Sequence, residues 1–318
     1  MRYLSFAPIL LLACACSSPT PSFEDRRAAD HNRIGAEAFQ RGELGDAALH
    51  FEQALEYARG LADRRQQIDA LNNIGIVHET LGQTGKALEF YEQSLEMAAP
   101  HSGGDDEDPF FTPYHMGTFS ASLNRSRVLL NQGRLEESRA ALDAAAAAAS
   151  EIGSHITRAA CQKQRALLEQ ELGNNERAFD LAREAVRLYE ISEYSAANLA
   201  GLADARLILG RLLQEQGELV KAITEFRSAS RLARKISDRT LTAVALESIA
   251  RALADSGHLE DARVPYEMAL DVNRLIPNTS RARRNVLALR EIGERLERVD
   301  LVQEYDLLLS ELEQEEDG

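Results

Sequence analysis

The apolar residues of Ile34–Glu56 recur at the three- and four-residue spacings of an amphipathic helix. A glycine, Gly42, interrupts this pattern, and Ala47, Phe51 and Ala54 then resume it. Glycine favours the backbone bend at the C-terminal end of a helix, and alanine lets a second helix approach the first closely. The segment therefore predicts two helices joined by a tight turn at Gly42.

The same pattern returns along most of the chain. A turn glycine followed five residues later by Ala or Ser occurs six times, at steps of 40, 51, 40, 44 and 40 residues. A nearly constant period indicates a repeat architecture, in which each hairpin buries its apolar face against its neighbours. The six pairs are Gly42/Ala47, Gly82/Ala87, Gly133/Ser138, Gly173/Ala178, Gly217/Ala222 and Gly257/Ala262.

We assign the helical array to residues 28–278, with a loop insertion at 99–113 that accounts for the 51-residue step. The insertion contains glycines, an acidic run and prolines, which favour a loop. Its acids lack the spacing of a calcium-binding loop, so we expect no metal there. Residues 279–318 predict a degenerate helical pair that caps the apolar end of the stack, followed by an acidic tail.

These hairpins resemble the tetratricopeptide repeat family. The resemblance implies an all-α fold, a right-handed superhelical solenoid of about six helical hairpins with a C-terminal capping hairpin. It is weaker in the third and fourth units, where Arg125-Ser126 and Arg165-Ala166 replace the expected apolar and small pair. The 40-residue period exceeds the commoner one of about 34 residues. It is similar to the longer-helix branch of the family, which is typical of scaffold and peptide-sensor proteins.

The N-terminus has one positive charge, an uncharged stretch and small residues around two cysteines. This pattern is typical of an export signal, and the stretch is too short to span a bilayer. Leu11-Leu12-Ala13-Cys14 resembles the bacterial lipobox, which implies cleavage before Cys14 and lipid attachment to its sulfur. Cys16 is the alternative lipidation site, and ordinary secretion or a misread N-terminus are alternative interpretations. We therefore expect a lipoprotein signal peptide at 1–13 and a flexible tether at 14–27.

The formal net charge of −15 argues against nucleic-acid binding, because phosphate contacts need clustered Lys and Arg. Cys161 lies in a helical apolar pattern, so we expect it to be a small buried residue. His78-Glu79 starts like a zinc-hydrolase motif, but the turn glycine Gly82 stands where the second histidine is required. The sequence therefore predicts no enzyme, no metal and no cofactor.

A stack of helical hairpins presents a concave groove lined by the first helix of each hairpin. Helical spacing from the small residue of each first helix selects the side chains that should face this groove. In the first two units they include the amides Asn32 and Asn72, with Asn73 beside them, and in the last unit they include Glu247. The later units also supply a line of basic residues: Arg127, Lys163, Arg211 and Arg251. Amides can pair with an extended peptide backbone, and arginine can bind carboxylates. Alternatively, these charges are paired with nearby acids such as Glu171, Glu215 and Asp255.

We expect a non-catalytic scaffold that is anchored by lipid to the bacterial cell envelope and faces the periplasm or the outer surface. Its partners are expected to be proteins or peptides with an acidic or extended segment, bound in the concave groove. It would touch the membrane through the N-terminal lipid. The alternative function is a peptide-sensing regulatory protein whose array changes shape when ligand binds. The 40-residue period and Asn72-Asn73 favour this alternative.

Overall fold

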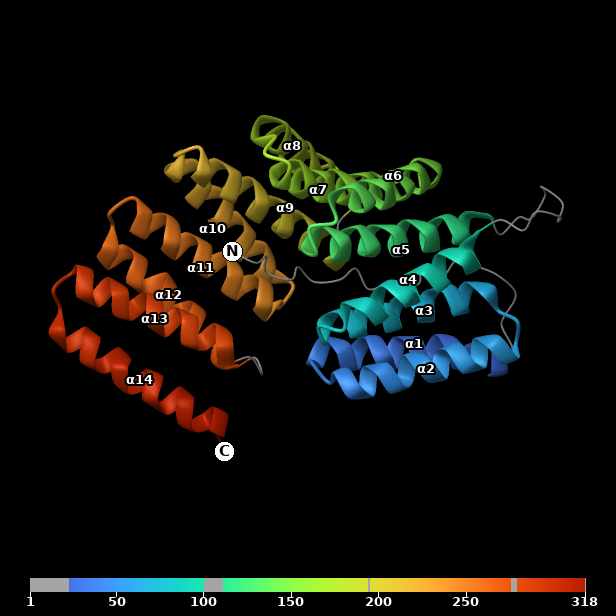
Figure 1. Cartoon of the computed structure of the whole chain (residues 1–318), viewed down its shortest axis with the longest axis horizontal. Coiled ribbons are helices and arrows are strands. Elements are labelled where there is room, and N and C mark those ends of the chain that lie inside the picture. Colours follow the sequence, from blue (N-terminus) through green and yellow to red (C-terminus); the bar gives the residue numbers. More distant parts are fainter. Residues whose placement is uncertain (1–22, 100–110, 194, 276–278, 318) are drawn as a thin grey trace. The chain divides into compact units, whose positions relative to one another are not determined.

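The computed structural model describes residues 23–99, 111–193, 195–275 and 279–317. These residues form fourteen helices and no strand (Figure 1), so the predicted all-α fold of stacked hairpins is confirmed. Cys14, Cys16, the signal peptide at 1–13 and residues 100–110 of the insertion lie outside the described residues. The first helix begins at Phe23, so it includes the last part of the segment assigned to the tether.

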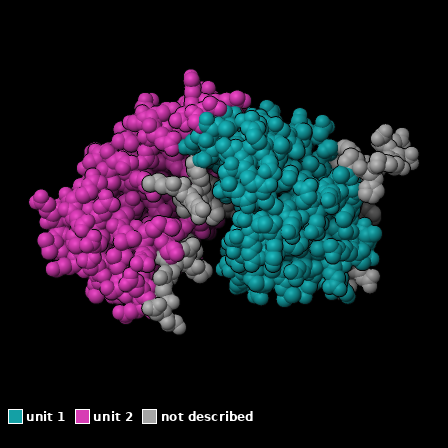
Figure 2. Space-filling view, viewed as in Figure 1, with its two compact units in different colours: residues 1–172 teal, residues 173–318 magenta. Residues whose placement is uncertain are grey.

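The helices fall into two compact units, coloured separately in Figure 2. Unit 1 covers residues 1–172 and holds α1 (Phe23–Arg41), α2 (Leu44–Gly60), α3 (Arg64–Thr80), α4 (Thr84–Ala98), α5 (Phe111–Asn131), α6 (Leu135–Ile152) and α7 (His155–Glu171). Unit 2 covers residues 173–318 and holds α8 (Asn175–Glu190), α9 (Ala196–Glu215), α10 (Leu219–Lys235), α11 (Arg239–Asp255), α12 (Leu259–Arg274), α13 (Thr279–Arg295) and α14 (Val299–Asp317).

The predicted turn glycines end the first helix of each hairpin. All six have φ between 73° and 82°, in the left-handed region that glycine adopts without a steric penalty. Between α13 and α14 this conformation is taken by Glu297, with φ 57°. The six are Gly42, Gly82, Gly133, Gly173, Gly217 and Gly257.

The small residue of a first helix lets an aromatic side chain of the second helix pack against the backbone. A Cβ added at Gly75 would lie 2.5 Å from the ring of Tyr91, and one added at Gly210 would lie 2.4 Å from the ring of Phe226. Both aromatic side chains are fully buried. The close approach of the two helices therefore requires glycine at these positions.

The third hairpin joins its two helices by hydrogen bonds where others use an aromatic contact. The Ser126 and Ser138 hydroxyls lie 3.0 Å apart, and the Ser138 hydroxyl also donates to the Ser126 carbonyl oxygen. Arg125, in the usual apolar position, forms an ion pair with Glu92 of α4. These contacts explain how a unit that departs from the sequence pattern keeps the hairpin.

The predicted helical pair at the C-terminal end is present as α13 and α14. Val286, Leu289 and Ile292 of α13 are buried against Tyr266 and Leu270 of α12. No helix among the described residues is both long and apolar enough to cross a bilayer.

Candidate functional site

The first helices of unit 1 lie beside one another: α1 contacts α3, α3 contacts α5, and α5 contacts α7. We call the surface that they share the first-helix face of unit 1. Five of the predicted groove residues belong to these helices: Asn32, Asn72, Asn73, Arg127 and Lys163. The other two, Arg211 on α9 and Arg251 on α11, belong to unit 2.

Side-chain amides connect three helices of this face. Asn32 of α1 donates from Nδ2 to Gln66 Oε1 over 3.1 Å and accepts from Asn73 Nδ2 at 3.5 Å. On the other side of α3, Asn124 of α5 donates from Nδ2 to Asn72 Oδ1 over 3.2 Å. We call Asn32, Gln66, Asn72, Asn73 and Asn124 the amide ladder. It brings together the three predicted asparagines and adds two residues that the sequence analysis missed.

The amide ladder has hydrogen-bonding capacity that its own members do not use. Asn72 and Asn73 are 0% and 2% exposed. Asn72 Nδ2 and Asn73 Oδ1 have no hydrogen-bond partner among the described residues. A buried polar atom without a partner costs about 1–3 kcal/mol. The ladder therefore holds one donor and one acceptor that are unused, and both are closed to solvent in this structure.

Arg127 is held by groups of its own unit. Its Nη2 lies 2.6 Å from Glu79 Oε2 and 3.3 Å from Asn124 Oδ1, and the Tyr91 hydroxyl donates to the same Glu79 oxygen over 2.9 Å. Burial lowers the pKa of Arg127, but Glu79 and Tyr91 outweigh it and leave this pKa above its ordinary value. Burial, followed by the charge of Glu79, also raises the pKa of Tyr91. The guanidinium is therefore a structural part of the first-helix face, and Arg127→Glu would disturb the core as well as the groove.

Asp69 is a half-buried carboxylate on α3, four residues before Asn73. Residues four apart lie on the same side of a helix, so Asp69 is next to the amide ladder. It makes no hydrogen bond or ion pair within the described residues, and burial raises its pKa to about 6 although Arg65 acts to lower it. The sequence analysis did not select it. The sequence does contain a signal that could have identified Asp69: it is the only acid in a stretch of α3 that otherwise consists of apolar and amide residues.

The remaining basic candidates lie on the later first helices. Lys163 and Arg211 are half-buried on α7 and α9, and Arg251 is exposed on α11. Arg251 acts on Tyr266 of α12, where burial raises the tyrosine pKa and Arg251 lowers it. Each residue is thus placed within its own unit.

In unit 2, the repeat position that corresponds to Asn72 of unit 1 is occupied by a charged residue, Glu247. Glu247 of α11 is 9% exposed, and its Oε1 accepts from Asn273 Nδ2 of α12 over 3.0 Å. The Asn285 amide of α13, oriented so that it satisfies both Glu247 and Asn273, donates to the same Glu247 oxygen over 3.0 Å. Burial lowers the pKa of Arg281, and Glu247 acts to raise it. These side chains join α11, α12 and α13, so Glu247 belongs to the core of unit 2 although its spacing had indicated the groove.

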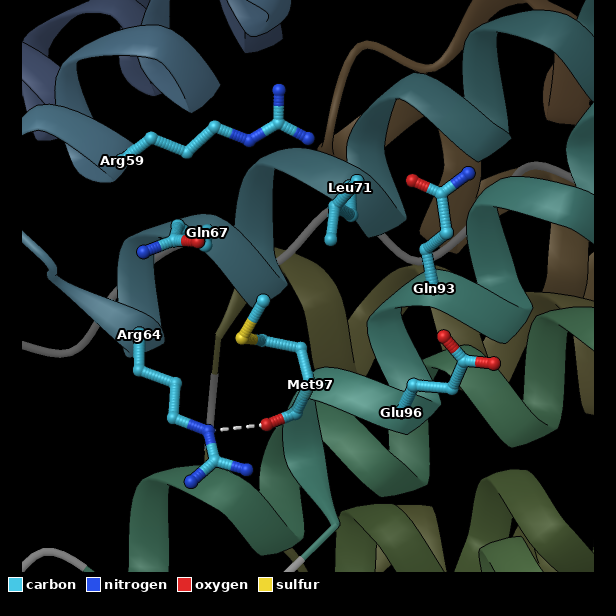
Figure 3. A pocket seen from close by; sticks show the side chains of 7 residues that line it. All are labelled: Arg59, Arg64, Gln67, Leu71, Gln93, Glu96 and Met97. Carbon is cyan, nitrogen blue, oxygen red and sulfur yellow. Dashed lines mark hydrogen bonds between the residues drawn. The ribbon is translucent and has the colours of Figure 1, made fainter.

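A pocket of about 280 Å³ lies between α2, α3 and α4 (Figure 3). Arg64 forms one wall and donates to the carbonyl oxygen of Met97 in the last turn of α4 (Figure 3). It also donates to the carbonyl oxygen of Ala99, the residue that follows α4. Its guanidinium lies 4.9 Å from the centre of the Tyr114 ring. Arg64 therefore ties the C-terminal end of α4 to α3 and α5, which is a structural role.

The described residues contain no group of three or more metal-ligating side chains suited to a metal ion. Cys161 is a buried free thiol, as expected, and burial raises its pKa to about 12. A thiol with such a pKa is not a nucleophile at neutral pH.

Comparison with known proteins places the repeats in a family. The tetratricopeptide repeat model matches residues 25–99, 117–191 and 201–274, and no enzyme family is found. No sequence match is found among curated proteins.

Several solved structures share the fold at low identity. The apo form of RapI has a TM-score of 0.59 and 15% identity, and the match covers 92% of this chain and 99% of that one. A Rap protein complexed with competence and sporulation factor has a TM-score of 0.62 and 16% identity, covering 91% and 75%. A signal transduction ATPase with a tetratricopeptide repeat sensor from Pyrococcus horikoshii has a TM-score of 0.59 and 13% identity, covering 92% and 43%. The repeated hairpins and the match over most of the sequence agree: the chain belongs to the tetratricopeptide repeat family.

Proposed function

We propose that this chain is a non-catalytic scaffold that binds an extended protein segment on the first-helix face of unit 1. The observation that carries the proposal is the amide ladder, with a donor at Asn72 Nδ2 and an acceptor at Asn73 Oδ1 that lack partners among the described residues. An extended backbone offers a carbonyl and an N–H at nearly every residue, so a segment that displaces the side chains covering these two atoms can satisfy both.

The charges of unit 1 bear on which segment fits best. Glu79 balances the charge of Arg127, and Asp69 adds a carboxylate beside the amide ladder. This favours recognition of the peptide backbone over recognition of acidic side chains at α3. A preference for acidic partners rests on Lys163, Arg211 and Arg251 and stays a prediction.

The binding site is tested by photo-crosslinking in living cells. A photoreactive amino acid replaces Asp69 on α3, and a matched control carries it at Gln93, an exposed residue of α4. We expect a discrete protein adduct from position 69 that is absent from position 93 and is lost when Asn73→Ala is added. The same adducts from both positions, or adducts only from position 93, would reject the site.

We further propose that the chain is anchored in the bacterial envelope through lipid on Cys14, with Cys16 as the alternative. The support is the lipobox-like sequence directly before a folded array. The test is membrane fractionation of Cys14→Ser, Cys16→Ser and the double variant, with and without globomycin. Release of the double variant from the membrane is expected, and the single variants identify the lipidated residue. Membrane association that persists in the double variant would contradict this part of the proposal.

The second candidate function is a peptide-sensing regulator. The specific observation is the likeness of fold to a Rap protein that was crystallised with a peptide factor. Small-angle scattering of this chain, with and without the segment identified by crosslinking, separates the two functions. A sensor changes its scattering curve on binding, whereas a static scaffold keeps it.

A further inference from the structure

Three aromatic or imidazole side chains cover the end of unit 1 where the described helices begin: His31 of α1, and His50 and Tyr57 of α2. We call them the end cluster. Forty residues later the same repeat positions hold Leu71, Phe90 and Met97. There Leu71 and Phe90 pack into the core shared with the first hairpin, and Leu71 and Met97 line the pocket between α2, α3 and α4.

Terminal hairpins of a repeat stack carry a polar outer face. Lysine, glutamate or glutamine would meet that need. Two imidazoles in contact go beyond it, since they place two metal-ligating nitrogens next to each other.

The two imidazoles face each other across α1 and α2. His31 Nδ1 lies 3.1 Å from His50 Nδ1, and the ring centres are 5.4 Å apart with 30° between the planes. The His31 ring also stacks on Tyr57, with 5.3 Å between centres and 15° between planes. Both histidines are half-buried, so this packing limits their rotamers while leaving an approach from solvent.

We propose that His31 and His50 form a two-nitrogen site for a divalent first-row transition-metal ion of the Ni²⁺, Cu²⁺ and Zn²⁺ group. Two nitrogens bound to one zinc ion at about 2.0–2.1 Å lie roughly 3.3 Å apart in a tetrahedral arrangement. In a square-planar copper or nickel site they lie roughly 2.9 Å apart. The observed 3.1 Å falls between these two spacings.

In the metal-free protein one Nδ1–H donates to the other Nδ1. Metal binding requires that this proton move to Nε2 of the same ring, and that both rings rotate so that their lone pairs converge on the ion. Water completes the coordination. Three charged or titratable neighbours act on His31: His50 and Arg27 oppose a cation there, and Asp30 favours one. The guanidinium of Arg27 lies 5.5 Å from the centre of the Tyr57 ring.

The site is tested on the full chain, purified in detergent without a polyhistidine tag and freed of metal by a chelator. Ni²⁺, Cu²⁺ and Zn²⁺ are titrated separately by calorimetry. We expect one equivalent bound more tightly than the background from surface carboxylates, and at least a tenfold loss of affinity in both His31→Gln and His50→Gln. His258→Gln, which changes an exposed histidine of unit 2, is the matched control and should retain the affinity.

Copper electron paramagnetic resonance adds a readout of the ligands. Coupling to two nitrogens is expected in the parent chain, and to one nitrogen in either single variant. A double variant, His31→Leu with His50→Phe, copies the second hairpin and keeps the proposal testable if glutamine disturbs folding. Unchanged affinity in any of these variants, or coupling to a single nitrogen in the parent chain, would overturn the assignment.

Discussion

In unit 1, side-chain amides of the first helices bond to one another across α1, α3 and α5. In unit 2, Glu247 of α11 instead bonds to Asn273 of α12 and Asn285 of α13. Asn72 and Glu247 hold the same place in their hairpins, three residues before the small residue of the first helix. A buried carboxylate must be surrounded by donors, so its neighbours turn toward it. A neutral amide tolerates an incomplete set of hydrogen-bond partners, so the Asn72 and Asn73 amides of unit 1 keep one donor and one acceptor unused. We propose that this repeat position supports stability in unit 2 and binding in unit 1.

The largest effect is expected from removing the charge at the centre of the unit 2 cluster. Glu247→Ala leaves the buried Asn273 and Asn285 without their shared acceptor and removes the negative charge that acts on Arg281. Breaking a buried charged network costs about 3–5 kcal/mol. Urea unfolding measures this loss. Glu291→Ala, an exposed change on α13, is the control and should stay within about 0.5 kcal/mol. A cost of Glu247→Ala as small as that of the control would remove the distinction between the units.

Asn273→Ala is the amide counterpart in unit 2. It removes a donor to Glu247 and should lower the free energy of unfolding by about 1–3 kcal/mol. The measurement is again urea unfolding, compared with the exposed change Asn131→Ala at the end of α5. A neutral Asn273→Ala would mean that Glu247 is satisfied without it.

Asp69→Asn should stabilise unit 1 at neutral pH. Burial raises the pKa of Asp69 from 3.8 to about 6, so between these values the folded state binds more protons than the unfolded state. Stability therefore falls as pH rises through this window, and the penalty is complete above about pH 6. Removing the charge should gain about 1–2 kcal/mol at pH 7.5, allowing for the partial exposure of the side chain, and little below pH 4. We would measure melting temperatures across this pH range for Asp69→Asn and for the exposed control Asp271→Asn. An equal gain at all pH values would contradict the raised pKa of Asp69.

The smallest effect on stability is expected for Asn73→Ala. This change breaks a long hydrogen bond of 3.5 Å to a half-exposed partner and also removes a buried oxygen that has no partner. The two effects oppose each other, so the net change should be under about 1 kcal/mol. Unfolding measured beside Asn273→Ala tests the comparison directly, and a larger cost for Asn73→Ala would reverse it.

The hairpin fold could be predicted from the sequence because its determinants are local. The turn glycines have positive φ, and the crossings at Gly75 and Gly210 need a small residue opposite an aromatic one. Both requirements can be seen in the sequence as a spacing. The third hairpin shows the limit of this signal. Ser126 and Ser138 keep the crossing by hydrogen bonds, which a pattern of apolar residues does not register.

The candidate site was predicted only in part because its chemistry depends on partners far apart in the sequence. Helical spacing placed Asn32, Asn72 and Asn73 on first helices, and the structure joins them. Spacing alone could not show that Arg127 pairs with Glu79, 48 residues away, or that Glu247 turns into the core of unit 2. The contacts across the stack decide which side chains remain available.

The central claim is that unit 1 binds an extended segment through the amide ladder. Its most direct test is the affinity of the crosslinked segment, made as a labelled peptide, for the parent chain, Asn73→Ala and Asn273→Ala, measured beside their unfolding curves. The account predicts at least a tenfold loss of affinity for Asn73→Ala with nearly parental stability, and the opposite for Asn273→Ala. Affinity that follows stability in both variants, or that is unchanged in Asn73→Ala, would contradict it.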